Sequence, residues 1–184
     1  MLKALTHMQE LQADQASTLL QVTLPALKNE HRITKKIIEA VPLDKGDYRP
    51  DPNAKTALEL AWHIAATENM FLKVPSSGEF DFSGNAMPES VRNSADVAQW
   101  YAEHFAESFD KLTRLTPEQL FKVIDFRGLF KLSAVMYLEV GLKHSIHHRG
   151  QLTVYLRPMG AKVPSIYGES YDDRQDRLAA QANS

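Results

Sequence analysis

The chain has 184 residues, 21 Lys and Arg against 23 Asp and Glu, a formal net charge of −2, and no cysteine. This length fits one domain over residues 1–184, and the near balance of charge favours neither nucleic acid nor a membrane surface as a partner. Without cysteine, disulfides and thiolate ligands are excluded, so any metal must be held by His, Asp or Glu.

No run of about 18 uninterrupted apolar residues, which a membrane-spanning helix needs, occurs anywhere in the chain. The first residues also lack the apolar stretch of a secretory leader. We therefore expect a soluble cytoplasmic protein.

Four segments have helical periodicity, and passages rich in Pro, Gly, Asn and Asp separate them, which predicts an all-α helix bundle. The expected helices cover roughly residues 15–40, 56–74, 94–115 and 132–157. Pro25 lies inside the first helix, where it either kinks the helix or marks its true start. Thr56 and Glu59 have the spacing of a capping box at the start of the second helix, and residues 75–78 (PSSG) are expected to close it.

Between the third and fourth helices, Phe121–Phe126 alternates like a short strand, and Arg127 with Gly128 is typical of a turn. After the fourth helix the chain is expected to be extended through Tyr171, and it ends in a polar, Ala-rich tail. These expectations leave the four helices as the frame for any functional site.

The fourth helix carries three of the seven histidines within five residues, at positions 144, 147 and 148. At 100° per residue, His144 and His148 lie only about 40° apart, one turn above the other, so that both imidazoles reach one ion. His147 points elsewhere, about 60° from His144 and about 100° from His148. Burying two adjacent imidazoles costs hydrogen bonds, and coordination of Zn²⁺, Ni²⁺ or Fe²⁺ removes that cost.

His63 is the preferred third ligand because it lies on the apolar stripe of the second helix. His31 and His104 have weaker support, and His7 lies near the terminus. A single histidine on an apolar stripe is more often a hydrogen-bonded core residue than a ligand, so this simpler interpretation stays open for each of them.

The neighbours of these histidines have simpler explanations than catalysis. We expect His147 at the surface or supporting the site from outside, and Arg149 either solvated or in a salt bridge between helices. Gly150 in mid-helix suggests a close contact with another helix. Glu59, one turn before His63, is better explained as a helix cap than as a proton acceptor.

The chain resembles DinB-like (damage-inducible) proteins of the DinB/YfiT-like superfamily. The resemblance is carried by residues 144–152 (HSIHHRGQL), 155–160 (YLRPMG) and 163–168 (VPSIYG). Upstream, residues 47–50 (DYRP), 60–65 (LAWHIA) and Glu68 resemble the family segment with its first histidine. The likeness spans roughly residues 15–172, which we take as the core of the domain.

This resemblance implies an up-down-down-up four-helix bundle with a long crossover, often dimeric, and a divalent metal held by His63, His144 and His148. Family relatives include thiol S-transferases, thiol-dependent isomerases and hydrolases, so it does not fix one reaction. It favours a small-molecule substrate, with a low-molecular-weight thiol as a candidate cosubstrate.

Two functions therefore compete. The first is a metal-dependent enzyme that activates water or a thiol cosubstrate, as a hydrolase or a thiol S-transferase. The alternative is a non-catalytic, metal-binding stress-response bundle, in which the ion only pins helices together. A structural site usually has four protein ligands, whereas a catalytic site keeps one position open. Three good ligands favour the enzyme.

Overall fold

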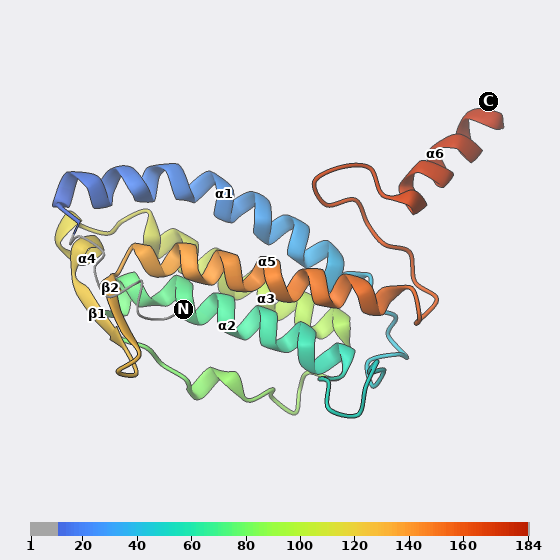
Figure 1. The fold of residues 1–184 in the computed structure, drawn as a ribbon, viewed down its shortest axis with the longest axis horizontal. Coiled ribbons are helices and arrows are strands. Elements are labelled where there is room, and N and C mark those ends of the chain that lie inside the picture. The colour runs from blue at the N-terminus through green and yellow to red at the C-terminus, as the bar shows by residue number, and fades with distance from the viewer. Residues whose placement is uncertain (1–10, 184) are drawn as a thin grey trace.

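A computed structural model describes residues 11–183, so His7 lies outside the described part of the chain. Four long helices form a bundle (Figure 1): α1 (Ala13–Glu39), α2 (Ala57–Ser77), α3 (Ser94–Leu112) and α5 (Met136–Leu156). α2 and α3 run antiparallel to α1, α5 runs parallel to α1, and residues 78–93 cross the length of the bundle between α2 and α3. The predicted all-α, up-down-down-up bundle with a long crossover is confirmed.

The four helices pack as a square. α1 and α2 each pack against both α3 and α5, which places them at opposite corners. Apolar side chains from all four long helices form the largest cluster of the core, which includes Ile38, Leu60, Tyr101, Leu152 and Tyr155. Burial of these side chains is the main force that holds the helices together. α2 and α5 are therefore direct neighbours, as a site shared between them requires.

The start of α2 follows from its sequence. The Thr56 hydroxyl accepts from the Glu59 backbone N–H at 3.1 Å, and the Glu59 carboxylate accepts from the Thr56 N–H at 2.7 Å. This is the expected capping box. The expected end at residue 74 was three residues too early, because α2 continues through Pro75 to Ser77. The helix stops within the expected closing segment, at Gly78, whose φ of 78° favours glycine. Likewise, Pro25 lies inside α1 and does not mark its start.

A small hairpin precedes α5. After the short helix α4 (Pro117–Phe121), strand β1 (Val123–Phe126) pairs antiparallel with β2 (Phe130–Ser133). The turn contains Arg127 and Gly128, both with positive φ, as the sequence suggested. The predicted start of the fourth helix at residue 132 was wrong, because its first residues pair with β1 and α5 begins at Met136.

The polar tail is a helix, which the sequence analysis did not predict. α6 (Tyr171–Ala182) begins at Ser170, whose hydroxyl accepts from the Asp173 backbone N–H at 3.0 Å. It projects from the bundle (Figure 1) and none of its residues is buried. The crossover segment, residues 78–93, also contains a 3-10 helix, η2 (Ser83–Asn85).

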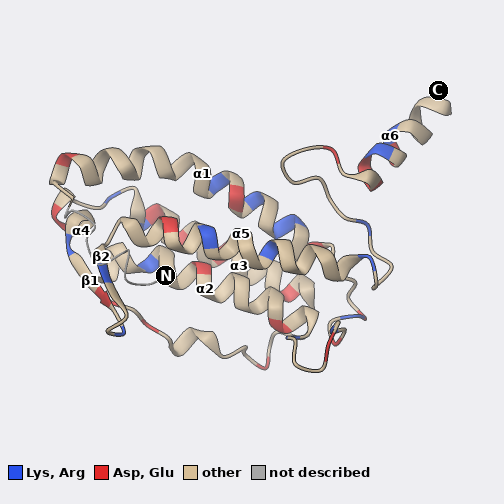
Figure 2. Cartoon of the chain, viewed as in Figure 1, with Lys and Arg blue, Asp and Glu red and all other residues tan. Residues whose placement is uncertain are grey.

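Charged residues of both signs are interspersed on all four long helices (Figure 2). Within the described residues, no helix is both long enough and apolar enough to cross a lipid bilayer.

The close approach of α2 to α5 depends on Gly141, not on Gly150. A Cβ atom at Gly141 would lie 2.5 Å from Cβ of Phe71 on α2, whereas one at Gly150 would meet nothing within 4 Å. The expected close contact at Gly150 was therefore wrong, since that residue is exposed. Gly141 lies one turn before His144, so this contact sets the helix separation beside the histidines.

We expect Gly141→Ala to lower the free energy of unfolding by about 1–3 kcal/mol, because the added methyl group must displace Phe71 or separate the helices. Gly150→Ala is the matched control: it should raise the free energy of unfolding by about 0.5–1 kcal/mol, through helix propensity alone. Urea denaturation of both variants measures the difference. Equal effects of the two substitutions would contradict the close contact at Gly141.

Candidate metal centre

Three histidines from two helices meet on the α2–α5 interface. His63 of α2 faces His144 and His148 of α5, with ring centroids 4.9 Å and 4.6 Å from it and 4.4 Å between the two α5 rings. One ring nitrogen from each lies within 4.8 Å of the other two. All three side chains are half-buried. The structure thus brings together the three residues that the sequence analysis selected.

The spacing of the ring nitrogens fits a shared ion. Nε2 of His63 and Nε2 of His148 are 3.3 Å apart. Two nitrogens bound at about 2.0–2.1 Å in tetrahedral geometry are separated by about 3.3–3.4 Å. In addition, Nδ1 of His144 is buried and has no hydrogen-bond partner among the described residues. An unpaired buried nitrogen is costly, and coordination or a partner supplied by a ligand would remove that cost.

Two polar side chains orient the imidazoles. The Gln151 side-chain oxygen accepts from Nδ1 of His148 at 3.1 Å, which leaves Nε2 of that ring unprotonated and turned toward His63. Gln151 in turn donates to the Tyr155 hydroxyl at 3.3 Å. Thr67 places its hydroxyl 3.4 Å from Nδ1 of His63. Such outer partners fix the tautomer of a metal-binding histidine.

The sequence analysis gave Gln151 and Thr67 no such role. The signal that identifies them is their spacing, since Gln151 follows His148 by three residues and Thr67 follows His63 by four. On a helix, residues at these spacings lie side by side.

The environment favours the neutral form of His63 and His144. Burial, followed by the neighbouring His148 and Lys55, lowers the pKa of His63 to about 4. Burial, followed by the nearby histidines, lowers the pKa of His144 to about 3. At neutral pH both rings therefore have a lone pair available for coordination.

The remaining histidines of the described chain do not join this cluster. His147 is exposed, and its ring is 4.8 Å from that of His148. His31 stacks on Phe105, with centroids 3.7 Å apart, inside the bundle. His104 stacks on Trp100 and donates from Nδ1 to its backbone carbonyl at 2.8 Å.

Carboxylates near the site have other partners. Glu59 caps α2, as expected. Glu68, five residues after His63, is buried and accepts from the Tyr101 hydroxyl at 2.7 Å. Among the described residues, the cluster of candidate ligands therefore has three members, and all are histidines.

Arg149 has a structural role in the core. Only 1% exposed, it donates to the Glu30 carboxylate at 2.6 Å and to the Thr34 hydroxyl at 3.1 Å. The Tyr167 hydroxyl accepts from Arg149 and donates to Glu30. Of the two expectations, the salt bridge between helices is thus correct. This ion pair ties α5 to α1.

A pocket opens beside the histidine cluster. Its volume is about 260 Å³, and it is lined by Lys55, Glu59, Trp62, His63, Asn85 and Met87. The indole N–H of Trp62 donates to the Asn85 carbonyl at 3.1 Å, which holds the crossover segment against α2. His63 is thus accessible from the pocket.

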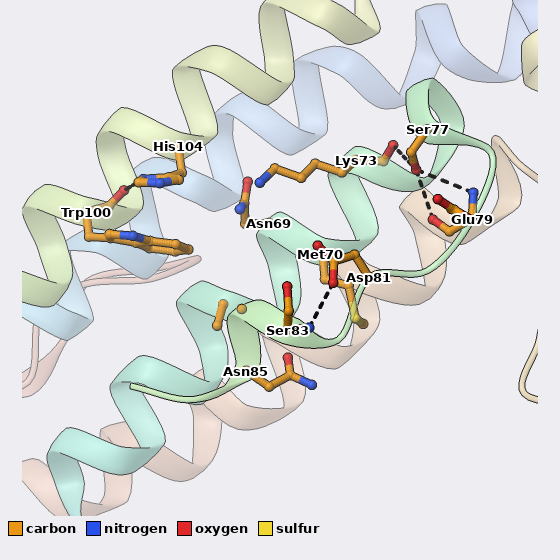
Figure 3. A pocket seen from close by; sticks show the side chains of 12 residues that line it. Asn69, Met70, Lys73, Ser77, Glu79, Asp81, Ser83, Asn85, Trp100 and His104 are labelled. Atoms are coloured by element: carbon orange, nitrogen blue, oxygen red, sulfur yellow. Dashed lines mark hydrogen bonds between the residues drawn. The ribbon is translucent and has the colours of Figure 1, made fainter. Parts of the chain in front are cut away.

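A larger pocket, of about 430 Å³, lies between α2, α3 and the crossover (Figure 3). Its walls include Asn69 and Lys73 of α2, Trp100 and His104 of α3, and Asn85, which also lines the smaller pocket. None of the three clustered histidines lines it. The chemistry of the histidines therefore belongs with the smaller pocket.

The comparisons with known proteins agree with this structure. The DinB family matches residues 12–181. The Bacillus subtilis protein YjoA is 32% identical over 133 residues, which cover 71% of this chain and 84% of YjoA. The crystal structure of YjoA, a DinB-like protein, superposes with a TM-score of 0.66 at 27% identity, covering 80% of this chain and 98% of YjoA.

A DinB-like protein of Bacillus cereus has the same fold, with a TM-score of 0.65 and 24% identity over 78% of this chain and 95% of that one. The resemblance noted from the sequence is confirmed, and the chain belongs to the DinB family.

Proposed function

We propose that the protein is a metal-dependent enzyme in which His63, His144 and His148 hold one divalent transition metal ion. The observation that supports this most is the meeting of three imidazoles beside a pocket, with no fourth protein ligand among the described residues. Imidazole nitrogens suit Zn²⁺, Ni²⁺ and Fe²⁺. A site with three ligands leaves a position for a substrate.

Bound there, such an ion would lower the pKa of a water or thiol toward neutrality, and three neutral ligands leave its full charge available for this. The chain's own residues supply the rest of the site. Gln151 and Thr67 orient the ligand rings, and Trp62 and Met87 give the pocket an apolar lining. A hydrolase or a thiol S-transferase acting on a small molecule fits this arrangement.

A non-catalytic, metal-binding bundle is the second candidate. It is favoured by the position of the cluster between α2 and α5, where an ion would also pin the two helices together. The two candidates differ in whether a ligand from solution reaches the metal.

Metal analysis followed by ligand exchange tests the proposal. We expect about one Zn²⁺, Ni²⁺ or Fe²⁺ per chain after reconstitution, and Co²⁺-substituted protein should change its visible spectrum when azide or a thiol is added. Hydrolysis of activated esters and thiol transfer to an electrophilic bimane should depend on the metal. Substoichiometric metal after reconstitution would refute the site, and a spectrum insensitive to added ligands would favour the non-catalytic bundle.

A further inference from the structure

The pocket beside His63 is lined by both apolar and charged residues. Trp62 and Met87 supply the apolar surface, and Lys55 and Glu59 are its two charged residues. Lys55 immediately precedes Thr56, the residue that caps α2. The lysine therefore lies just before the capped start of α2, the helix that carries His63.

The two charges differ in how far they are neutralised. Glu59 accepts from the Thr56 backbone N–H and lies 3.9 Å from the Arg49 guanidinium. Lys55 is exposed and forms no ion pair in the described part of the chain. The ammonium group is thus the charge of this pocket that has no ion-pair partner among the described residues, although it also interacts with the more distant charge of Glu59.

A ligand in this pocket would lie close to both Lys55 and His63. Lys55 lines the pocket together with His63, so the ammonium group and the imidazole border the same volume. Neutral imidazoles add no negative charge to the cluster, so a bound divalent ion would make this side of the pocket still more positive. A negative group on a ligand would be attracted by both.

We propose that Lys55 selects substrates that carry an anionic group, held by the ammonium while the reactive end of the molecule faces the histidine cluster. The pocket volume of about 260 Å³ limits such a ligand to a small organic anion. Glu59 works against this selection and disfavours ligands with two adjacent negative groups. The inference rests on the proposed function, because it takes the histidine cluster as the reactive end of the site.

Three small thiols that share a two-carbon chain and end in an anionic, a neutral or a cationic group test this selection. The probes are 2-mercaptoethanesulfonate, 2-mercaptoethanol and 2-aminoethanethiol, titrated into Co²⁺-substituted protein and followed by the thiolate-to-cobalt absorption. Because a sulfonate group binds metal ions only weakly, its effect on thiol affinity reflects its interaction with the protein. In Lys55→Gln we expect binding of the sulfonate to weaken by about five- to tenfold, that of the alcohol to stay unchanged, and that of the amine to tighten.

Two further variants serve as controls. Lys111→Gln removes the same charge from the exposed face of α3 and should change none of the three affinities beyond twofold. Glu59→Gln retains the capping hydrogen bonds and should tighten sulfonate binding. Metal content of every variant is measured first, and all should retain the ion.

The outcomes separate this inference from the proposed function. If no thiol alters the cobalt spectrum, the open metal position is refuted and the selection with it. If all three thiols bind but Lys55→Gln leaves their relative affinities unchanged, the proposed function survives and the role of Lys55 is overturned. Equal losses in Lys55→Gln and Lys111→Gln would likewise overturn it, because the effect would then be one of net charge.

Discussion

His148→Ala and His144→Ala are each expected to lower metal affinity by more than about 100-fold, whereas His147→Ala should change it less than threefold. Loss of an outer partner of a metal ligand typically costs about 10–100-fold, so loss of a ligand itself must cost more. Gln151→Ala should lower metal affinity by an intermediate amount, since it removes only the hydrogen bond that orients the His148 ring. Competition with a metal-binding dye measures all four affinities.

His147→Ala is the matched control, because it removes an imidazole from the same helix, next to His148 but outside the cluster. Comparable loss in His147→Ala and His148→Ala would contradict the ligand assignment. His63→Ala tests the contribution of α2: if metal raises its melting temperature as much as that of the wild type, α2 supplies no ligand.

Acid provides a second measure of the same site. An ordinary imidazole, with a pKa near 6.5, would lose metal below about pH 6. The pKa values of His63 and His144, lowered to about 4 and about 3, place their competition with protons at lower pH. Both groups are neutral in the folded state over a wider pH range than in the unfolded chain. Their contribution to metal-free stability is therefore complete above pH 6.5, is lost progressively as the pH falls from 6.5 to about 4 and about 3, and changes no further below these values.

The metal-induced rise in melting temperature should therefore persist at pH 5.5 and vanish toward pH 3.5. Thermal melts with and without metal across this range measure it. Complete loss of the increment at pH 5.5 would mean that these two rings titrate like exposed histidines.

Glu30→Ala is expected to lower the free energy of unfolding by about 3–5 kcal/mol, because it leaves the Arg149 guanidinium buried without its counter-charge. The side chain of Arg149 is 2% exposed and that of Glu30 is 12% exposed, with 2.6 Å between the charged atoms. Chemical denaturation measures the change. Loss of the pair should also loosen α1 from α5, the helix that carries His144 and His148.

An exposed pair is the control. Arg114 and Asp110 lie 2.7 Å apart on the surface, with 74% and 56% of their side chains exposed, so Asp110→Ala should cost less than about 1 kcal/mol. The double variant Glu30→Leu with Arg149→Met should recover most of the loss, because it removes both buried charges. If Glu30→Ala costs no more than Asp110→Ala, the buried pair does not stabilise the bundle.

Much of this protein follows from local patterns in the chain. The periodicity of four segments gives the helices, Thr56 and Glu59 give the start of α2, and Arg127 with Gly128 gives the turn of the hairpin. The spacing of His144 and His148 puts both rings on one face of α5, because a helix repeats every 3.6 residues. These features depend only on residues near one another in sequence.

Helix ends were predicted less well where a distant partner decides them. The fourth helix starts later than its periodicity suggests, because Phe130–Ser133 find hydrogen bonds with β1. The close helix contact expected at Gly150 occurs at Gly141 instead. The position of α2 determines which of the two glycines packs against Phe71, and the local sequence does not specify that position. The homodimer and the thiol cosubstrate implied by the resemblance stay predictions.

By itself the sequence determined the all-α class, the bundle, the family and the choice of His63, His144 and His148. Tertiary structure alone decided what these residues face, because helix packing joins side chains that lie 85 positions apart, such as His63 and His148. Only in the folded chain is Arg149 buried in an ion pair with Glu30, and only there does Gln151 accept a hydrogen bond from His148. The fold likewise places Lys55 in the pocket beside His63. Periodicity specifies which side of a helix a residue occupies, whereas the partner on that side depends on how distant segments fill the interior together.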